Sequence, residues 1–370
     1  MRQYESDERI VMTLDAGGTN FVFSAIQSNK EIVTPITFPS NADNLELCLK
    51  TITHGFTQVR DILKEDPVAI SFAFPGPADY PRGIIGDLGN LPAFRGGVAL
   101  GSFLEEKFSL PVFINNDGNL FVFGEAIAGL LPEVNRLLEN AGSSKRFWNL
   151  FGITLGTGFG GGIVIDGNLV VGDNSAAGEI WLMRNKFEKN LNAEEGASIR
   201  GVKRFYALAV GVPEESVPEP KQLFRIARGE AEGNMAAARE AFHMMGEVVG
   251  DALANAITLV DGIIVIGGGL AGAAELFMPK VVAELNSRFD QVNGGSVRRL
   301  ETQAFNLNNP EELNAFIRVD ERTIRVPGTV KTIAYDPLQR IGVGTTRLGT
   351  SIAVSIGAYA YALRYLDNEE

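Results

Sequence analysis

The chain of 370 residues is poor in the side chains that bind transition metals: it has one cysteine, Cys48, and two histidines, His54 and His243. A lone cysteine excludes an intramolecular disulfide, and a tetrahedral zinc site of Cys and His is hard to assemble from this inventory. Basic residues are also few, since 33 Lys and Arg stand against 45 Asp and Glu, a net charge of −12. This balance argues against a duplex-DNA binder, which usually carries a basic face.

Long hydrophobic runs are missing as well. No stretch approaches the roughly 20 apolar residues of a membrane span. Residues 1–9 are charged and lack the apolar core of a secretory signal. We therefore predict a cytoplasmic protein with no nucleic-acid or membrane partner.

Alternating apolar strands and helically spaced segments predict an α/β protein. Strands are expected at 10–15, 20–27, 31–38, 68–74 and 112–115, and helices at 41–64, 100–108 and 117–129. The layout then starts again, with strands at 148–155, 161–166 and 263–266, and helices at 198–209, 219–229, 233–261 and 271–289. This repetition predicts two lobes, one of residues 1–130 plus 349–370 and one of 131–348. Residues 290–345 are harder to interpret, with strand-like pieces at 323–326 and 330–334, and are expected to be an insertion that edges the cleft or builds an interface.

Three glycine-rich turns follow predicted strands. They read Asp15-Ala16-Gly17-Gly18-Thr19-Asn20, then Gly156-Thr157-Gly158-Phe159-Gly160-Gly161-Gly162, and finally Gly267-Gly268-Gly269-Leu270. Glycine lets backbone N–H groups approach a phosphate closely. None of the turns matches the P-loop pattern, and any one of them alone is equally a tight hairpin. Three together favour nucleotide binding.

Two aspartates stand at strand ends beside these features. Asp15 closes a buried strand, where an acid either holds Mg²⁺ through water or simply shapes the turn. Asp117, in Asn115-Asn116-Asp117-Gly118-Asn119, lies between a strand and a helix, where an acid either caps the helix or faces a ligand. Phosphoryl transfer to an alcohol needs a carboxylate that accepts the hydroxyl proton, and Asp117 is the candidate.

Further motifs, in order along the chain, are Pro75-Gly76-Pro77, Gly89-Asn90-Leu91-Pro92, Gly124-Glu125 and Gly178-Glu179. Together with the turns and Asp117 they resemble the ROK family, a branch of the actin/hexokinase superfamily. The resemblance implies a two-lobed actin-like ATPase fold, which is ribonuclease H-like, with mixed sheets flanked by helices and a cleft between the lobes. It also implies ATP and Mg²⁺ as cofactors, a sugar substrate and a homodimer.

The resemblance assigns roles to individual residues. Asp117 is the general base. The residues implied to bind ATP are Asp15, Gly17, Gly18, Thr19, Asn20, Gly156, Thr157, Gly158, Gly160, Gly268, Gly269 and Leu270, with Asp15 also at the Mg²⁺. The residues implied to line the sugar are Gly76, Asn90, Asn116, Asp117, Glu179 and Glu194.

The chain departs from the family in two neighbouring motifs. The Glu-x-Gly-His of family kinases is replaced by Glu179-Ile180-Trp181-Leu182, and the cysteine-rich zinc loop is missing, so no zinc site is expected. Trp181 either stacks on the sugar or fills the volume of the lost loop. The glutamate that follows the loop is Glu194 by its spacing to Ser198, with Glu195 as the alternative.

The resulting hypothesis is ATP-dependent phosphorylation of a hexose or hexose derivative, of the glucokinase, fructokinase or N-acetylhexosamine kinase type. The alternative is a non-catalytic sugar sensor of the same family. An ATPase or acyl-phosphate kinase of the superfamily fits Asn90, Asn116 and Asp117 less well.

Overall fold

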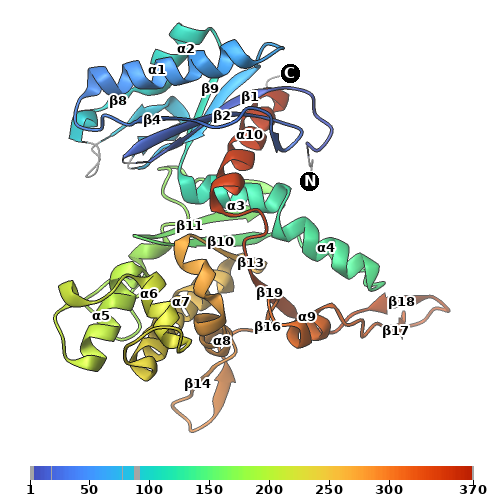
Figure 1. The fold of residues 1–370 in the computed structure, drawn as a ribbon. Helices are drawn as coiled ribbons and strands as arrows, with labels where there is room; N and C mark the ends of the chain where they lie inside the picture. The colour runs from blue at the N-terminus through green and yellow to red at the C-terminus, as the bar shows by residue number, and fades with distance from the viewer. Residues whose placement is uncertain (1–3, 18, 77, 87–91, 369–370) are drawn as a thin grey trace. The chain divides into compact units, whose positions relative to one another are not determined.

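The computed structural model describes residues 4–17, 19–76, 78–86 and 92–368. The chain divides into two compact units. The first unit comprises Met1–Gly129, Gly162–Gly178 and Arg347–Glu370, and the second comprises Leu130–Gly161 and Glu179–Thr346. Figure 1 shows the helices and strands of each unit.

The first unit is built on a six-stranded mixed sheet of order β3-β2-β1-β5-β9, with β4 also pairing with β2. Its strands are β1 (Val11–Ala16), β2 (Asn20–Gln27), β3 (Lys30–Glu31), β4 (Ile36–Pro39), β5 (Ala69–Ala73) and β9 (Val112–Asn115). β1, β5 and β9 are parallel, whereas β1 and β2 form an antiparallel hairpin. A small sheet joins β6 (Ala78–Asp79), β7 (Ile84–Ile85) and β8 (Val98–Ala99).

Helices cover both faces of the first sheet. One face carries α1 (Leu45–Ile62) and α2 (Leu100–Phe108), and the other carries α10 (Thr350–Asn368), with α3 (Asp117–Ile127) packed along it (Figure 1). The core between α1 and the sheet is aromatic: the rings of Phe23 and Phe56 meet edge to face, with centroids 5.2 Å apart. Such pairs add stability beyond the area that they bury.

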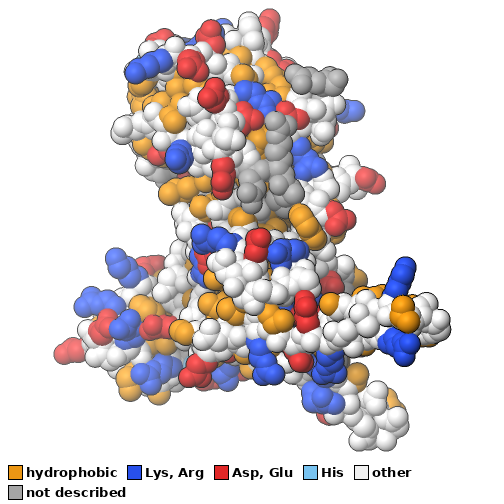
Figure 2. Space-filling model, turned by 90° about the vertical axis from the view of Figure 1, so that its right-hand side faces the viewer, with side chains coloured by type: hydrophobic (Ala, Val, Ile, Leu, Met, Phe, Trp, Pro, Cys, Tyr) orange, Lys and Arg blue, Asp and Glu red, His pale blue; other side chains and the backbone are white. Residues whose placement is uncertain are grey.

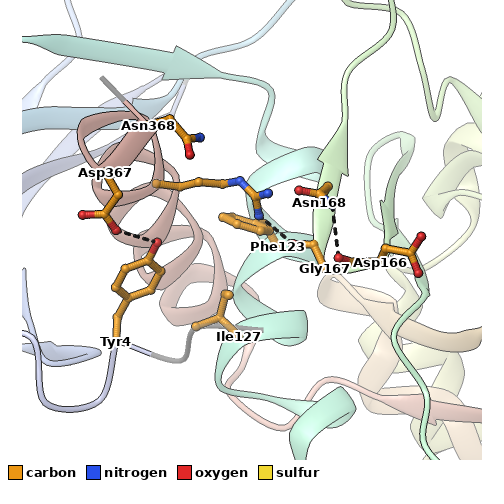
Figure 3. Close-up of a pocket in the computed structure, with 9 residues that line it drawn as sticks. Tyr4, Phe123, Ile127, Asp166, Gly167, Asn168, Asp367 and Asn368 are labelled. Atoms are coloured by element: carbon orange, nitrogen blue, oxygen red, sulfur yellow. Dashed lines mark hydrogen bonds between the residues drawn. The ribbon is translucent and has the colours of Figure 1, made fainter. Parts of the chain in front are cut away.

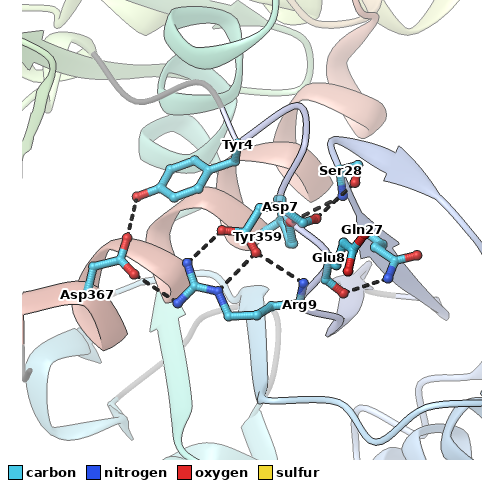
Figure 4. A network of polar contacts seen from close by, with 8 residues as sticks. All are labelled: Tyr4, Asp7, Glu8, Arg9, Gln27, Ser28, Tyr359 and Asp367. Atoms are coloured by element: carbon cyan, nitrogen blue, oxygen red, sulfur yellow. Dashed lines mark hydrogen bonds and ion pairs between the residues drawn. The ribbon is translucent and has the colours of Figure 1, made fainter.

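The last helix is tied to the first residues of the unit. Arg9 donates to Asp7 at 2.7 Å and to Asp367 of α10 at 2.8 Å, and the Tyr359 hydroxyl donates to the Asp7 carbonyl (Figure 4). At the other end of α10, the buried Glu125 carboxylate of α3 accepts the backbone N–H of Arg347 at 3.1 Å. α10 is therefore fixed by residues 7–9 at one end and by α3 at the other.

The second unit contains the parallel strands β10, β13, β19 and β16 of one sheet and the start of β11, which continues into the first unit and pairs there with β12. The strands are β10 (Leu150–Leu155), β11 (Phe159–Ile165), β12 (Asn168–Val170), β13 (Ile263–Gly267), β16 (Gln303–Asn306) and β19 (Arg340–Thr345). The helices are α4 (Leu130–Asn140), α5 (Ile199–Val210), α6 (Pro220–Ala227), α7 (Met235–Val260), α8 (Ala274–Leu285) and α9 (Pro310–Ile317). β10, β13, β19 and β16 are parallel, and the near-continuous apolar sequences of β10 and β13 match strands buried on both faces.

The stretch 290–345 is only in part separate from this sheet. β16 and β19 are strands of the sheet itself, and β19 pairs with both β13 and β16. Two hairpins of the same region stand outside the sheet: β14 (Arg288–Asp290) with β15 (Ser296–Arg298), and β17 (Arg322–Arg325) with β18 (Thr332–Tyr335). The expected helix at 271–289 accordingly ends earlier, at Leu285, because the chain turns into β14.

Candidate functional site

The first unit brings three strand ends together. Asp15 at the end of β1 pairs in register with Ala73 of β5, and Ala73 pairs with Asn115 of β9. Since the three strands are parallel, the residues that follow them leave the sheet at one edge. The first glycine turn, the segment with Gly76 and the segment with Asp117 therefore start side by side.

The first turn is a tight reversal between β1 and β2. The Gly17 N–H donates to the Asn20 carbonyl at 3.0 Å, and a Cβ at Gly17 would lie 2.9 Å from that oxygen. Gly17, Thr19 and Asn20 are exposed, so their backbone is accessible to a ligand. Gly18 lies outside the described residues.

Asp117 is the first residue of α3, and hydrogen bonds fix its position. Asn116 is the N-cap, and the Gly118 N–H donates to the side chains of both Asn116, at 2.7 Å, and Asp117, at 2.9 Å. Behind them, the fully buried Asn115 accepts from the Asn116 N–H at 2.7 Å and from Asn119 Nδ2 at 3.0 Å. Asn115 thus holds the start of the helix through hydrogen bonds to its near neighbours in the chain.

The pKa values of both carboxylates at this edge are raised. Desolvation by the surrounding protein raises the pKa of Asp117, against two hydrogen bonds from backbone N–H groups that lower it. Desolvation, and then the charge of Asp117, raise the pKa of Asp15. Both side chains nevertheless remain accessible to solvent. Two neighbouring accessible acids with raised pKa values are typical of a functional site.

The remaining sugar residues predicted in this unit are Gly76 and Asn90. Gly76 is exposed, and a Cβ there would meet the Tyr80 hydroxyl at 3.0 Å. The Tyr80 hydroxyl in turn donates to the Phe74 carbonyl at 2.9 Å, which fixes the segment after β5. Asn90 lies outside the described residues.

The second unit brings the other two turns together. Thr154, near the end of β10, pairs with Gly267, the last residue of the parallel strand β13. Gly268 has φ +86°, and a Cβ there would lie 2.3 Å from the Leu155 carbonyl oxygen, so only glycine fits. The turn at 156–160 and the turn at 267–270 therefore leave the sheet at one edge, next to each other.

Glu194 is bound directly to the glycine turn of this unit. Its Oε2 accepts the backbone N–H of Phe159 at 3.0 Å, and its Oε1 accepts from Arg200 at 2.9 Å. Glu195 also accepts from Arg200, at 3.1 Å. A Cβ at Gly158 would lie 2.9 Å from Glu194 Oε2, so glycine is needed for the carboxylate to come this close. The sequence did not indicate the contribution of Arg200.

Glu179 has a partner two residues along the chain. The Trp181 indole N–H donates to the Glu179 carboxylate, and Glu179 itself is exposed. Leu182, in the place of the family histidine, is 60 % exposed. The short helix Ile180–Leu182 packs against Ala193–Glu195, so Glu179 and Glu194 stand on neighbouring turns of one unit.

A separate cavity of about 320 Å³ lies in the first unit and is lined in part by Phe123 and Ile127 of α3 and by Arg364 of α10 (Figure 3). Arg364 donates to the Gly167 carbonyl at 2.8 Å. None of the residues predicted to bind ATP or sugar lines this cavity. Among the described residues there is no group of three or more His, Cys, Asp and Glu arranged to hold a metal ion. No helix within the described part of the chain has the length and apolarity that crossing a membrane requires.

A mixed α/β fold in two units, with glycine turns and acids at the carboxyl ends of parallel strands, defines a class of phosphate-binding α/β proteins. Comparison with known proteins narrows the class. The ROK family model matches residues 11–310, and the chain belongs to the ROK family.

Three relatives illustrate the similarity. A glucokinase structure from Parabacteroides distasonis is 52 % identical, with a TM-score of 0.89 over 98 % of this chain and 99 % of that one. N-acetyl-D-glucosamine kinase from Vibrio parahaemolyticus is 29 % identical over 72 % of this chain and 87 % of its own length. A ROK family glucokinase from Streptomyces griseus, solved with glucose and AMPPNP, has a TM-score of 0.59 at 18 % identity over 95 % of this chain and 98 % of its own, and shares the fold. The predicted family and fold class are confirmed.

Proposed function

We propose that this chain transfers the γ-phosphoryl group of ATP to a hydroxyl group of a hexose or hexosamine. The kinases among its relatives support the reaction class. The observation that carries the proposal is the Asp117 carboxylate, which is accessible, has a raised pKa and stands beside the glycine turn that begins after Asp15.

Asp117 accepts the proton of the attacking sugar hydroxyl. The sugar oxygen then bonds to the γ-phosphorus, the bond from that phosphorus to the bridging oxygen breaks, and ADP leaves. A pKa above that of an ordinary aspartate makes the carboxylate a better base, as long as it stays ionised at working pH. Asn115 and Asn116 keep the carboxylate at the start of α3 through the whole step.

The backbone N–H groups of the glycine turns bind the phosphates, since glycine leaves them accessible. Asp15 fits Mg²⁺, because two neighbouring carboxylates of raised pKa are stabilised by a cation between them and the nucleotide. When bound, Mg²⁺ neutralises phosphate charge. Gly76, Asn90, Asn116, Glu179 and Glu194 bind the sugar hydroxyls, and Glu194 also links the sugar to the turn at 156–160 through the Phe159 N–H.

The test is turnover of Asp117→Asn against glucose and N-acetylglucosamine with ATP and Mg²⁺, followed by release of ADP. We expect a loss of about 10²- to 10⁴-fold in kcat, while ATP binding persists. Asp43→Asn, an exposed acid in the loop before α1, is the matched control and should retain full turnover. Folding raises the pKa of Asp117. The ionised carboxylate therefore lowers the stability of the folded chain at any pH above the pKa that this group has in the unfolded chain. Asp117→Asn should therefore be no less stable than the wild type at neutral pH.

Undiminished turnover in Asp117→Asn would remove this residue from the mechanism. A wild-type chain that binds sugar but releases no ADP with any hexose or hexosamine would contradict the kinase proposal and favour a sugar sensor.

A further inference from the structure

One loop joins the two glutamates that are predicted to bind the sugar in the second unit. Glu179 stands before this loop, residues 183–193 form it, and Glu194 follows it directly. The two ends of the loop are bound to each other, because the Ala193 N–H donates to the Met183 carbonyl at 2.7 Å. The shape of the loop therefore determines where Glu194 stands relative to Glu179.

The loop is built around the side chain of Asn185, which is 2 % exposed. Its Oδ1 accepts the backbone N–H groups of Phe187, at 3.0 Å, and of Glu188, at 3.2 Å. Its Nδ2 donates to the Asn192 carbonyl at 3.2 Å, across the loop. A Cβ at Gly196 would lie 3.0 Å from the same Nδ2, so the turn that follows Glu194 packs directly on this amide. A buried amide with all of these partners specifies one conformation of the loop.

The next residue, Lys186, fastens the loop to two helices. Its Nζ lies 2.6 Å from the Glu284 carboxylate of α8 and 3.1 Å from the Glu247 carboxylate of α7. Both carboxylates have a second cation, since Glu284 pairs with Arg299 at 2.6 Å and Glu247 with Lys280 at 3.6 Å. The two ion pairs of Lys186 are therefore part of a network.

This network differs from ordinary surface charge. Figure 2 shows acidic and basic side chains interspersed over one face of the molecule, and isolated exposed pairs of that kind contribute little to stability. The side chain of Lys186 is only 26 % exposed and that of Glu284 only 12 %. Partial burial reduces the screening by water, so these pairs hold the loop more firmly than exposed pairs would.

The residues of the loop do not fit a zinc ion. The loop has no cysteine and no histidine, and its one carboxylate, Glu188, pairs with Arg204 of α5 at 2.8 Å. Beside it, the rings of Phe187 and Phe205 meet edge to face, with centroids 6.2 Å apart. Hydrogen bonds, ion pairs and ring packing thus hold the loop on three helices.

We propose that Asn185 and Lys186 are positioning residues of the sugar site. Asn185 shapes the loop, Lys186 fixes it to α7 and α8, and together they place the Glu194 carboxylate. The inference rests on the proposed function, in which Glu194 binds a sugar hydroxyl. Neither Asn185 nor Lys186 touches a reacting group, so their loss should weaken sugar binding and leave phosphoryl transfer nearly unchanged.

The first experiment is steady-state kinetics of Lys186→Met with glucose and N-acetylglucosamine as acceptors. Because Glu284 keeps Arg299 and Glu247 keeps Lys280, neither carboxylate loses its last cation in this variant. We expect KM for the sugar to rise about tenfold and kcat to change by less than about threefold.

Two further substitutions serve as controls. Lys186→Arg keeps the positive charge beside both carboxylates and should restore a KM near that of the wild type. Lys189→Met removes an exposed lysine from the same loop and should leave both KM and kcat unchanged.

A double-variant cycle tests whether Lys186 acts through Glu194. Glu194→Gln keeps the size of the side chain but removes its charge, and should raise KM for the sugar by itself. Lys186→Met should raise KM by less than about twofold more in the Glu194→Gln background, because two changes that act through one group are not additive. Asn185→Ala should behave like Lys186→Met, alone and in that background.

Circular dichroism and the melting temperature show which variants fold, and Lys186→Met suffices if Asn185→Ala does not. The proposal is overturned if Lys186→Met leaves KM for the sugar unchanged, lowers kcat as much as kcat/KM, or adds its full effect to that of Glu194→Gln. Loss of sugar binding by the wild type after dialysis against EDTA would also overturn it, because a metal ion would then hold the loop.

The failure of this inference can be distinguished from that of the proposed function. A wild-type chain that releases no ADP with either sugar contradicts the kinase proposal. Isothermal titration calorimetry of sugar binding then gives dissociation constants that replace KM in the same cycle, and the roles of Asn185 and Lys186 are decided by them. A chain that binds neither sugar overturns both proposals.

Discussion

The crossing of α3 and α10 allows a sharp test of how the helix that carries Asp117 is held. The two helices touch through glycine: a Cβ at Gly124 would lie 1.9 Å from the Ala353 carbonyl oxygen, and a Cβ at Gly357 would lie 1.9 Å from the Leu120 carbonyl oxygen. Real Cβ atoms do not approach other atoms closer than 3.0 Å. Gly124→Ala must therefore move two helical backbones apart, because no flexible side chain is available to yield.

Two effects of opposite sign determine how much Gly124→Ala changes the free energy of unfolding. Alanine favours a helix over glycine by about 1 kcal/mol, which stabilises the variant. Forcing atoms into a packed core costs about 1–3 kcal/mol, and more where the obstacle is backbone. We expect Gly124→Ala to lower the free energy of unfolding by at least about 2 kcal/mol, since the separation of the helices also loosens their other contacts. Gly357→Ala should do the same, and the double variant should cost less than the sum, because one displacement relieves both clashes.

The assay is urea unfolding followed by circular dichroism, with turnover measured on the same samples. Gly272→Ala is the matched control, since a Cβ there meets nothing within 4 Å, and its stability should be unchanged. Turnover should fall in Gly124→Ala, because Asp117 moves with α3. If Gly124→Ala is as stable and as active as Gly272→Ala, the close crossing of the helices is refuted.

Three further predictions concern single ionisable groups. Arg340→Met leaves the Asp336 carboxylate, whose side chain is 8 % exposed, without its partner, and should cost about 3–5 kcal/mol in urea unfolding; equal stability would show that the ion pair contributes nothing. The acidic limb of kcat/KM should lie above the ordinary pKa of an aspartate, because the base works only when ionised and desolvation raises the pKa of Asp117; a limb at the ordinary pKa of an aspartate would show that Asp117 is not the base. Burial raises the pKa of the Cys48 thiol to about 11, so at pH 8 a thiol reagent should label the folded chain far more slowly than the unfolded chain, as mass spectrometry would show.

Much of the first unit could be predicted from the sequence. Its buried strands end in recognisable glycine turns, and the order of motifs indicates the family, so Asp15 and Asp117 stand out as candidates from the sequence alone. The register that aligns Asp15, Ala73 and Asn115 explains why these two acids are neighbours, because parallel strands deliver their ends to one edge.

Other parts of the molecule could not be predicted. The Phe159 N–H contacts Glu194, which lies 35 residues away along the chain, so this contact leaves no local pattern in the sequence. Asn115 and Arg200 form hydrogen bonds with near neighbours that their residue types alone do not specify. The sequence did not predict strand β19, because it begins with a charged residue, Arg340, as an exposed loop would. The Arg340 guanidinium is in fact buried against Asp336. Gly18 and Asn90 stay predictions, as they lie outside the described residues.

The way in which the chain threads its two units has a consequence for biosynthesis. The first unit needs both the strands made earliest and α10, which is made after the whole second unit. Until translation reaches Gly357, α3 lacks the helix against which it packs, and Glu125 has no Arg347 N–H to accept. A nascent chain can thus fold its second unit while the first unit is still incomplete. Premature termination before residue 347 should therefore yield a folded second unit attached to an aggregation-prone, inactive remainder.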